Sequence, residues 1–260
     1  MTSGQEKYVD KINKLLRKAE DKATPPPERD TCIAMAQNLM SKWAIDDAML
    51  QAADPSKVND EITTQEVVTV GIYRFPLSRL AWNAMRANNI KAVLYKNAGP
   101  RKVGERVFKQ TECYMAVGFA SDLRRFELMN TSLQIQCISA ESQWWDAHKD
   151  EYDHLKPSHQ HLERRGFMFG FANGVYDKLI EGKEQAKKES TVTHGSGMEL
   201  VLIDRSKQVD NFYHNMFSNL RMSTDRMNRG GYQAQGAGRE AGRRADTGSG
   251  GLRKQRELGN

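Results

Sequence analysis

The sequence has few cysteines, no long apolar run and no recognisable signal segment. Cys32, Cys113 and Cys137 form an odd and widely spaced set, whereas a disulfide-stabilised secreted domain needs a dense and even one. We therefore expect three buried free thiols in a cytoplasmic protein. No run approaches the roughly 18 apolar residues that mark a membrane-spanning helix. Residues 1–10 are polar and charged, so a signal peptide is not expected either.

Recognised catalytic motifs are also absent. Four of the six histidines are close together in the sequence, with acidic residues among them. Imidazole and carboxylate groups are good ligands for zinc, iron or manganese, but the spacing matches no zinc motif and HExxH does not occur. A solvated connector between two helices would explain the same residues. The four are His148, His154, His159 and His161. The sequence therefore assigns no catalytic residue, metal ligand or cofactor.

Positive charge is concentrated at the C-terminal end of the chain. Residues 221–260 contain nine basic and four acidic side chains, a net charge of +5 out of +6 for the whole chain. Such asymmetry favours a polyanionic partner, nucleic acid first. Guanidinium groups match the geometry of phosphate, and each phosphate contact adds to a salt-dependent affinity. The candidate nucleic-acid-binding residues are Arg221, Arg226, Arg229, Arg239, Arg243 and Arg244.

The apolar pattern of residues 1–53 predicts a helical hairpin module. Apolar residues recur at helical spacing over 9–19 and again over 33–43. The Thr-Pro-Pro-Pro segment at 24–27 should end the first helix, because proline lacks a backbone donor and disfavours a helical residue before it. A short third helix is expected over 47–52. Short helices bury little surface alone, so the module must dock on another element or on a partner.

Residues 61–220 have the pattern of an α+β domain in which two long helices cover a small sheet. Alternating, β-branched segments predict the strands, and a proline followed by a helical apolar stripe predicts a helix between the first two. The expected strands are Glu66–Arg74, Ile90–Tyr95 and Cys113–Gly118, with a helix over 76–87 and a Gly/Pro turn over 97–102.

The two long helices carry a further signal. One is expected to be capped by Ser121, and the other to begin near Pro157. In the second helix, Gly166, Gly170 and Gly174 fall at positions i, i+4 and i+8. Each glycine costs about 1 kcal/mol in a helix interior. Three on one face therefore predict the close approach of another helix or strand.

The remainder is expected to hold a charged loop over 181–197, a last strand over 199–204 and a last helix over 206–220. Residues 221–260 are rich in Gly, Arg and Gln, which predicts a basic tail that is partly disordered or forms a short helix. In a helix, Arg239 would lie on one face and small residues on the other. That helix would either bind a polyanion or pack on the body through its small residues.

Several motifs resemble one family of unknown function. The first two motifs are similar to the N-terminal signature of domain-of-unknown-function family 2786: Lys11-Ile12-x-Lys14-Leu15-Leu16-x-x-Ala19-Glu20 and Ala36-Gln37-x-Leu39-Met40-x-x-Trp43-x-Ile45-Asp46. Two more are similar to the domain that follows it: Val117-Gly118-Phe119-x-Ser121-Asp122-Leu123 and Leu128-x-x-Thr131-Ser132-Leu133. The last two resemble later motifs of that family: Phe167-x-x-Gly170-Phe171-Ala172-x-Gly174 and Ala241-Gly242-Arg243-Arg244-Ala245-Asp246. The resemblance implies an actinobacterial or phage origin, an intracellular role (the host cytoplasm if phage-encoded) and an ordered helix around residues 241–246. It assigns no activity.

Three functional hypotheses remain open. The first is a non-enzymatic accessory protein that binds nucleic acid electrostatically through its basic C-terminal region, without base readout. The second is a protein-interaction module whose N-terminal hairpin binds a host protein. The third is a metal-dependent hydrolase that uses the histidine cluster. The oligomeric state is not predicted.

Overall fold

The computed structural model describes residues 3–21, 23–25, 27–36, 38–39, 60–95, 99–194, 197–218, 220 and 230–247. The chain forms two compact units, each discontinuous in the sequence. One comprises Met1–Asp60, Arg124–Gln136 and Ala245–Asn260, and the other comprises Glu61–Leu123 and Cys137–Arg244. Helix α4 (Ala120–His148) contributes its central turns to the first unit and both of its ends to the second.

The first unit contains the expected helical hairpin. Helix α1 (Ser3–Glu20) ends before the prolines, and a second helical segment covers residues 27–36 and 38–39. The apolar stripes of both helices pack against each other and against the central turns of α4, which buries the stripes within the chain itself. The buried cluster consists of Ile12, Leu16, Ala19, Cys32, Ile33, Ala36, Leu128 and Ile135. The short helix expected over 47–52 lies outside the described residues.

The second unit is built on a three-stranded antiparallel sheet in the order β1-β5-β2, which confirms the α+β class. Strand β1 (Ile62–Val70) pairs with β5 (Thr111–Phe119) along its whole length, and β2 (Lys91–Tyr95) pairs with the central part of β5. The prediction placed the first strand too late, over Glu66–Arg74. Gly71, with φ at 84°, ends the strand and turns the chain into the next helix.

Helices lie on both faces of this sheet. On one face, Trp82 of α3 (Arg74–Ala87) stacks on Tyr114 of β5 with ring centroids 5.4 Å apart. Val209 of α6 (Gly197–Met216) is buried in a cluster with Val117 and Phe119 of the same strand. Because successive strand residues point to opposite faces, α3 and α6 cover opposite faces of the sheet.

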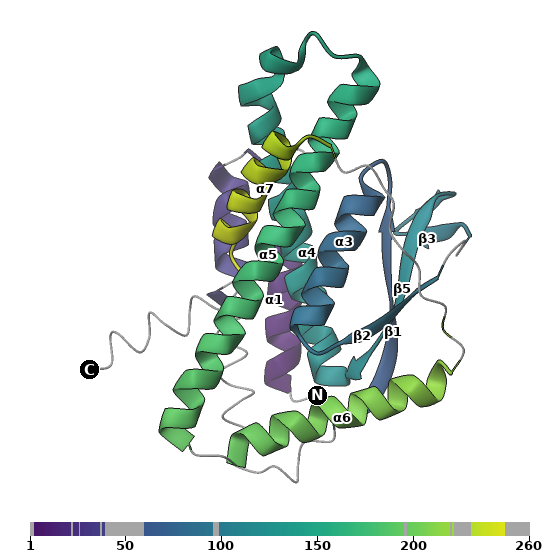
Figure 1. Cartoon of the computed structure of the whole chain (residues 1–260), viewed down its shortest axis with the longest axis vertical. Coiled ribbons are helices and arrows are strands. Elements are labelled where there is room, and N and C mark those ends of the chain that lie inside the picture. The colour runs from purple at the N-terminus through teal and green to yellow at the C-terminus, as the bar shows by residue number, and fades with distance from the viewer. Residues whose placement is uncertain are drawn as a thin grey trace. The chain divides into compact units, whose positions relative to one another are not determined.

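The element that packs on α3 is the long helix α5 (Pro157–His194), as Figure 1 shows. The buried amide of Asn83 on α3 donates to the carbonyl of Ala172 on α5 at 2.9 Å. Helices α3 and α6 thus lie against the sheet, whereas α5, one of the two long helices that were expected to cover it, packs on α3 instead. Helix α3 occupies the layer between the sheet and α5, which explains why it is buried on most sides.

Three local predictions were wrong. The loop expected over 181–197 is helical as far as His194, because its Glu, Lys, Gln and Ala residues are strong helix formers. The strand expected over 199–204 belongs to α6, since a short apolar run fits a helix as well as a strand. Ser121 does not cap α4: the helix begins at Ala120, after Phe119, without a side-chain cap.

The remaining elements are short. A 3-10 turn, η2 (Lys149–Tyr152), follows α4. Strands β3 (Arg101–Val103) and β4 (Arg106–Phe108) form a separate two-stranded sheet, which begins inside the segment predicted to be a turn. Helix α7 (Tyr232–Arg244) is the short helix considered for the C-terminal region. All three cysteines are buried and free. None of the helices described here is long and apolar enough to cross a membrane.

Candidate functional site

Helix α7 packs on α5 at a distance that only glycine permits. A Cβ added at Gly170 would overlap the carbonyl oxygen of Gln235, and one added at Gly174 would overlap that of Arg239. The arrangement is reciprocal, because Gly238 and Gly242 of α7 lie just as close to the backbone of α5. The close packing of α5 and α7 confirms the helix approach predicted from the glycine spacing. It also offsets the helix propensity that is lost at these glycines.

A polar contact and an apolar cluster hold the first part of α7 in place. At the start of α7, the backbone N–H of Gly231 donates to both carboxylate oxygens of Glu163 at 2.9 Å, which satisfies a donor at the helix N-terminus. Farther along, an aromatic cluster that includes Trp144 and Phe167 buries Ala234 completely. The helix is therefore held by its small face, the second of the two alternatives considered for it.

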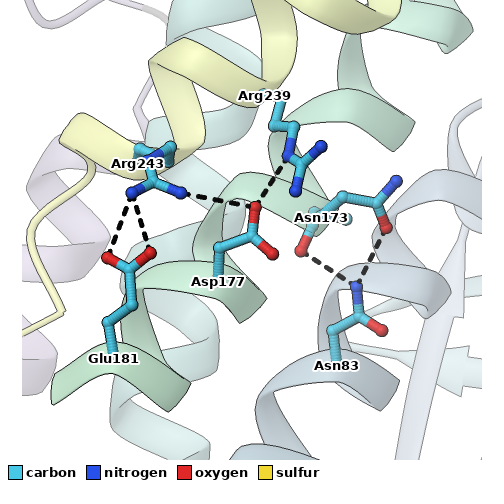
Figure 2. A network of polar contacts seen from close by, with 7 residues as sticks. Asn83, Asn173, Asp177, Glu181, Arg239 and Arg243 are labelled. Carbon is cyan, nitrogen blue, oxygen red and sulfur yellow. Dashed lines mark hydrogen bonds and ion pairs between the residues drawn. The ribbon is translucent and has the colours of Figure 1, made fainter.

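The arginine face of α7 pairs with acidic residues of α5, as Figure 2 shows. Arg239 Nε donates to Asp177 Oδ2 at 2.7 Å, and Arg243 Nη2 donates to Glu181 Oε1 at 2.8 Å. Arg243 Nη1 also lies 3.7 Å from Asp177 Oδ2. The Asp177 carboxylate raises the pKa of Arg239. These guanidinium groups thus have counter-charges within the protein, although their side chains are 59% and 46% exposed.

Three of the six candidate arginines lie in the described part of the chain. Arg239, Arg243 and Arg244 lie on α7, and Arg244 has no side-chain hydrogen bond or ion pair to any described residue. Three acids, Asp177, Glu181 and Glu240, lie on the same two helices at this crossing. The charges of these three arginines and three acids therefore cancel. The remaining candidates, Arg221, Arg226 and Arg229, lie outside the described residues.

The β3–β4 hairpin is a second basic element, which was not predicted from the sequence. Its nine residues from Arg101 to Lys109 hold four basic side chains and one acidic one, a net charge of +3. Within the described part of the chain, Lys102, Arg106 and Lys109 have no side-chain hydrogen bond or ion pair, and all three are exposed. In Figure 1 the hairpin lies on the side of the sheet away from α5 and α7. The signal was present as two short basic, β-branched runs around Gly104-Glu105.

The base and the turn of the hairpin are both well defined. Thr111 Oγ1 donates to the carbonyl of Gly99 at 3.0 Å, which closes the base against β5. Arg101 pairs with Glu66 of β1 at 3.5 Å. At the tip, Gly104 has φ at 59° in a two-residue loop, the position at which type II′ turns require glycine. The hairpin therefore presents its cations from a fixed backbone.

One buried ion pair lies between α4 and α5. Both nitrogens of the Arg164 fork reach Glu141, Nε to Oε1 at 2.5 Å and Nη2 to Oε2 at 3.2 Å, and the Glu141 side chain is only 2% exposed. The guanidinium lies over the rings of Trp145 and Tyr73. The hydrogen bond that Arg164 donates to Glu141 raises the pKa of Arg164, and burial raises the pKa of Tyr73. We interpret this pair as a structural contact, since its charges neutralise each other.

The histidine cluster is dispersed by the fold. His148 Nδ1 lies 2.8 Å from the carbonyl of Trp144, on whose ring it also stacks. His161 stacks on Tyr73, and burial, with Arg165 and Arg164 nearby, lowers its pKa. No group of three potential metal ligands occurs among the residues that the structure describes. The hydrolase hypothesis therefore has no support from the described geometry.

Comparison with known families finds one match, at the N-terminus. Residues 7–47 match the model of a family described as Protein of unknown function (DUF2786). The N-terminal segment is therefore similar to this family, whose description names no activity. The DUF2786 segment includes α1 from Lys7 onward and the second helical segment, so its apolar stripes are those that pack on α4. No curated protein matches the chain, and no solved structure matches it.

Proposed function

We propose that this protein binds nucleic acid through electrostatic contacts with phosphates, as a non-enzymatic accessory protein. The observation that carries the proposal is the β3–β4 hairpin. Lys102, Arg106 and Lys109 are exposed, none has a described counter-ion, and all three lie within eight residues on a fixed ribbon. Cations without internal partners gain most from phosphate, because no existing ion pair has to be broken.

The C-terminal arginines are a second part of the proposed surface. Arg239 and Arg243 would have to exchange Asp177 and Glu181 for phosphate, so we assign them a smaller share than the hairpin. Arg244 is exposed, and no described acidic residue pairs with it and would compete with phosphate. Arg221, Arg226 and Arg229 remain candidates from their sequence alone. An actinobacterial phage as the source, and a site of action in the host cytoplasm, are parts of this proposal that rest on the family resemblance.

The alternative of a host-protein adaptor is less favoured. The apolar stripes of the DUF2786 hairpin, which would be the natural surface for a partner, are already buried against Leu128 and Ile135 of α4. A partner would therefore have to use the polar outer surface of the hairpin.

The experiment that tests the proposal is a salt series of duplex DNA binding by the full chain. The hairpin variant K102Q/R106Q/K109Q is compared with the control K7Q/K11Q/K14Q, which removes the same charge from exposed positions on α1. Each phosphate contact contributes about one unit to the slope of log K against log salt. We expect the hairpin variant to lower the slope by about three and the control to leave it nearly unchanged. Equal slopes for the two variants would overturn the proposal.

A further inference from the structure

We infer that the β3–β4 hairpin enters the major groove of duplex DNA, so that the substrate class is double-stranded B-form DNA. This inference rests on the proposed nucleic-acid function and adds to it the form of nucleic acid and the mode of contact. Three features of the ribbon support it: its dimensions, the placement of its cations and the side chains that it lacks.

The ribbon has the dimensions of the groove. Its two strands have three residues each, which gives a length of about 10 Å at the usual rise of a strand. Paired strands lie about 4.8 Å apart. The major groove of B-form DNA is about 12 Å wide and 8.5 Å deep and admits a two-stranded ribbon, whereas the minor groove is about 6 Å wide. The two-residue loop at Gly104 keeps the tip narrow.

Cations leave the ribbon on both of its faces. The pairs Arg101↔Phe108 and Val103↔Arg106 are directly opposite each other, and so is Lys102↔Val107. Opposite residues share a face and neighbouring residues alternate. Arg101 and Arg106 therefore lie on one face and Lys102 on the other. A ribbon inserted in a groove has a phosphate wall on either side, and this distribution supplies a cation to each.

Two exposed valines lie near the tip of the ribbon. Val103 is 43% exposed and Val107 is 67% exposed, one on each face of the ribbon. Valine can approach base edges closely without adding a donor or acceptor that the groove would have to satisfy. The tip loop itself adds one acid, the exposed Glu105, whose carboxylate could accept from the amino group of cytosine on the groove floor.

The composition of the ribbon disfavours the other forms of nucleic acid. Single strands are bound by stacking of bases on exposed aromatic rings, and the only aromatic residue of the ribbon, Phe108, is partly buried. Duplex RNA has a deep and narrow major groove that protein elements do not enter. B-form DNA is the form of nucleic acid whose major groove admits the ribbon and whose phosphates complement its basic side chains.

The test measures binding of the full chain to three probes of matched length: a DNA duplex, one of its single strands and the corresponding RNA duplex. Each is titrated with the unmodified chain, with K102Q/R106Q/K109Q and with the α1 control K7Q/K11Q/K14Q. We expect the hairpin variant to lower the salt slope by about three on the DNA duplex and by less than about one on the other probes. Bulky C5 substituents on the pyrimidines, which fill the major groove, should weaken binding of the unmodified chain to duplex DNA.

The outcomes separate the inference from the proposed function. If the hairpin variant loses the same slope on all three probes, the hairpin contacts phosphates but does not enter a groove, and only the inference fails. The inference fails in the same way if the C5 substituents have no effect. If the hairpin variant and the α1 control behave alike on every probe, both the inference and the proposed function fail.

Discussion

The α5–α7 crossing and the β3–β4 hairpin are both rich in basic residues, but the fold treats them in opposite ways. At the crossing, Arg239 and Arg243 extend from a helix that is fixed by glycine packing, and Asp177 and Glu181 neutralise them. On the hairpin, Arg101 pairs with Glu66, but Lys102, Arg106 and Lys109 have no described counter-ions. A segment rich in basic residues therefore need not produce a positive electrostatic potential at the surface, because acids from a distant part of the chain can neutralise it.

The largest expected effect concerns the packing at the crossing. Gly238→Ala would place a Cβ against the backbone of Phe167, so we expect the free energy of unfolding to fall by about 2–3 kcal/mol. Gly236→Ala is the matched control on the same helix, because a Cβ there meets nothing within 4 Å. The control should stabilise the protein by about 0.5–1 kcal/mol through helix propensity. Urea unfolding followed by tryptophan fluorescence measures both, and equal effects would mean that α7 is not packed on α5.

A smaller effect is expected at the tip of the hairpin. Gly104→Ala meets no atom within 4 Å, but it forces an L-residue into a positive-φ conformation that costs about 1–2 kcal/mol. The cost should be confined to the hairpin, since no core residue is displaced. Amide exchange of Arg106 should therefore become at least about fivefold faster, while exchange within α5 stays unchanged. Loss of protection across the whole second unit would contradict a locally formed hairpin.

The smallest effect is expected on the arginine face of α7. The double variant R239Q/R243Q removes exposed ion pairs, which contribute little to stability, so its urea midpoint should barely move. Its salt slope on duplex DNA should fall by less than about one, against about three for the hairpin variant.

A second double variant removes the acidic partners on this face instead of the arginines. D177N/E181Q leaves both arginines in place and removes their counter-charges, so duplex DNA affinity should rise if these arginines face phosphate. A fall in slope of two or more with R239Q/R243Q would instead move the main binding surface to α7.

Much of the fold could be predicted from local patterns. Three features were predicted from a regular spacing of residues, and the folded chain keeps each of them. They are the apolar stripes of the N-terminal hairpin, the two strands around Ile90 and Cys113, and the glycine spacing on α5. The predictions failed where a short segment fits two structures. Residues 199–204 are apolar enough for a strand but continue a helix, because tertiary packing of Val209 and its neighbours on the sheet decides the matter.

The candidate site was harder to predict. The arginines of α7 were correctly seen as one helix face, but their partners Asp177 and Glu181 come from a segment 62 residues earlier, which no local pattern connects to them. The hairpin was missed because each of its strands has only three residues, too few for an alternation to be recognised.

The composite nature of the first unit has a consequence for the order of events during synthesis. The DUF2786 hairpin leaves the ribosome early, but its core includes Leu128 and Ile135, roughly a hundred residues later. At a typical rate of about 5–20 residues per second, the apolar stripes wait some 5–20 s for their cover. During that interval the exposed apolar stripes are a binding site for chaperones. A ribosome that stalls before α4 is made releases a fragment that lacks the helix covering the core of the hairpin.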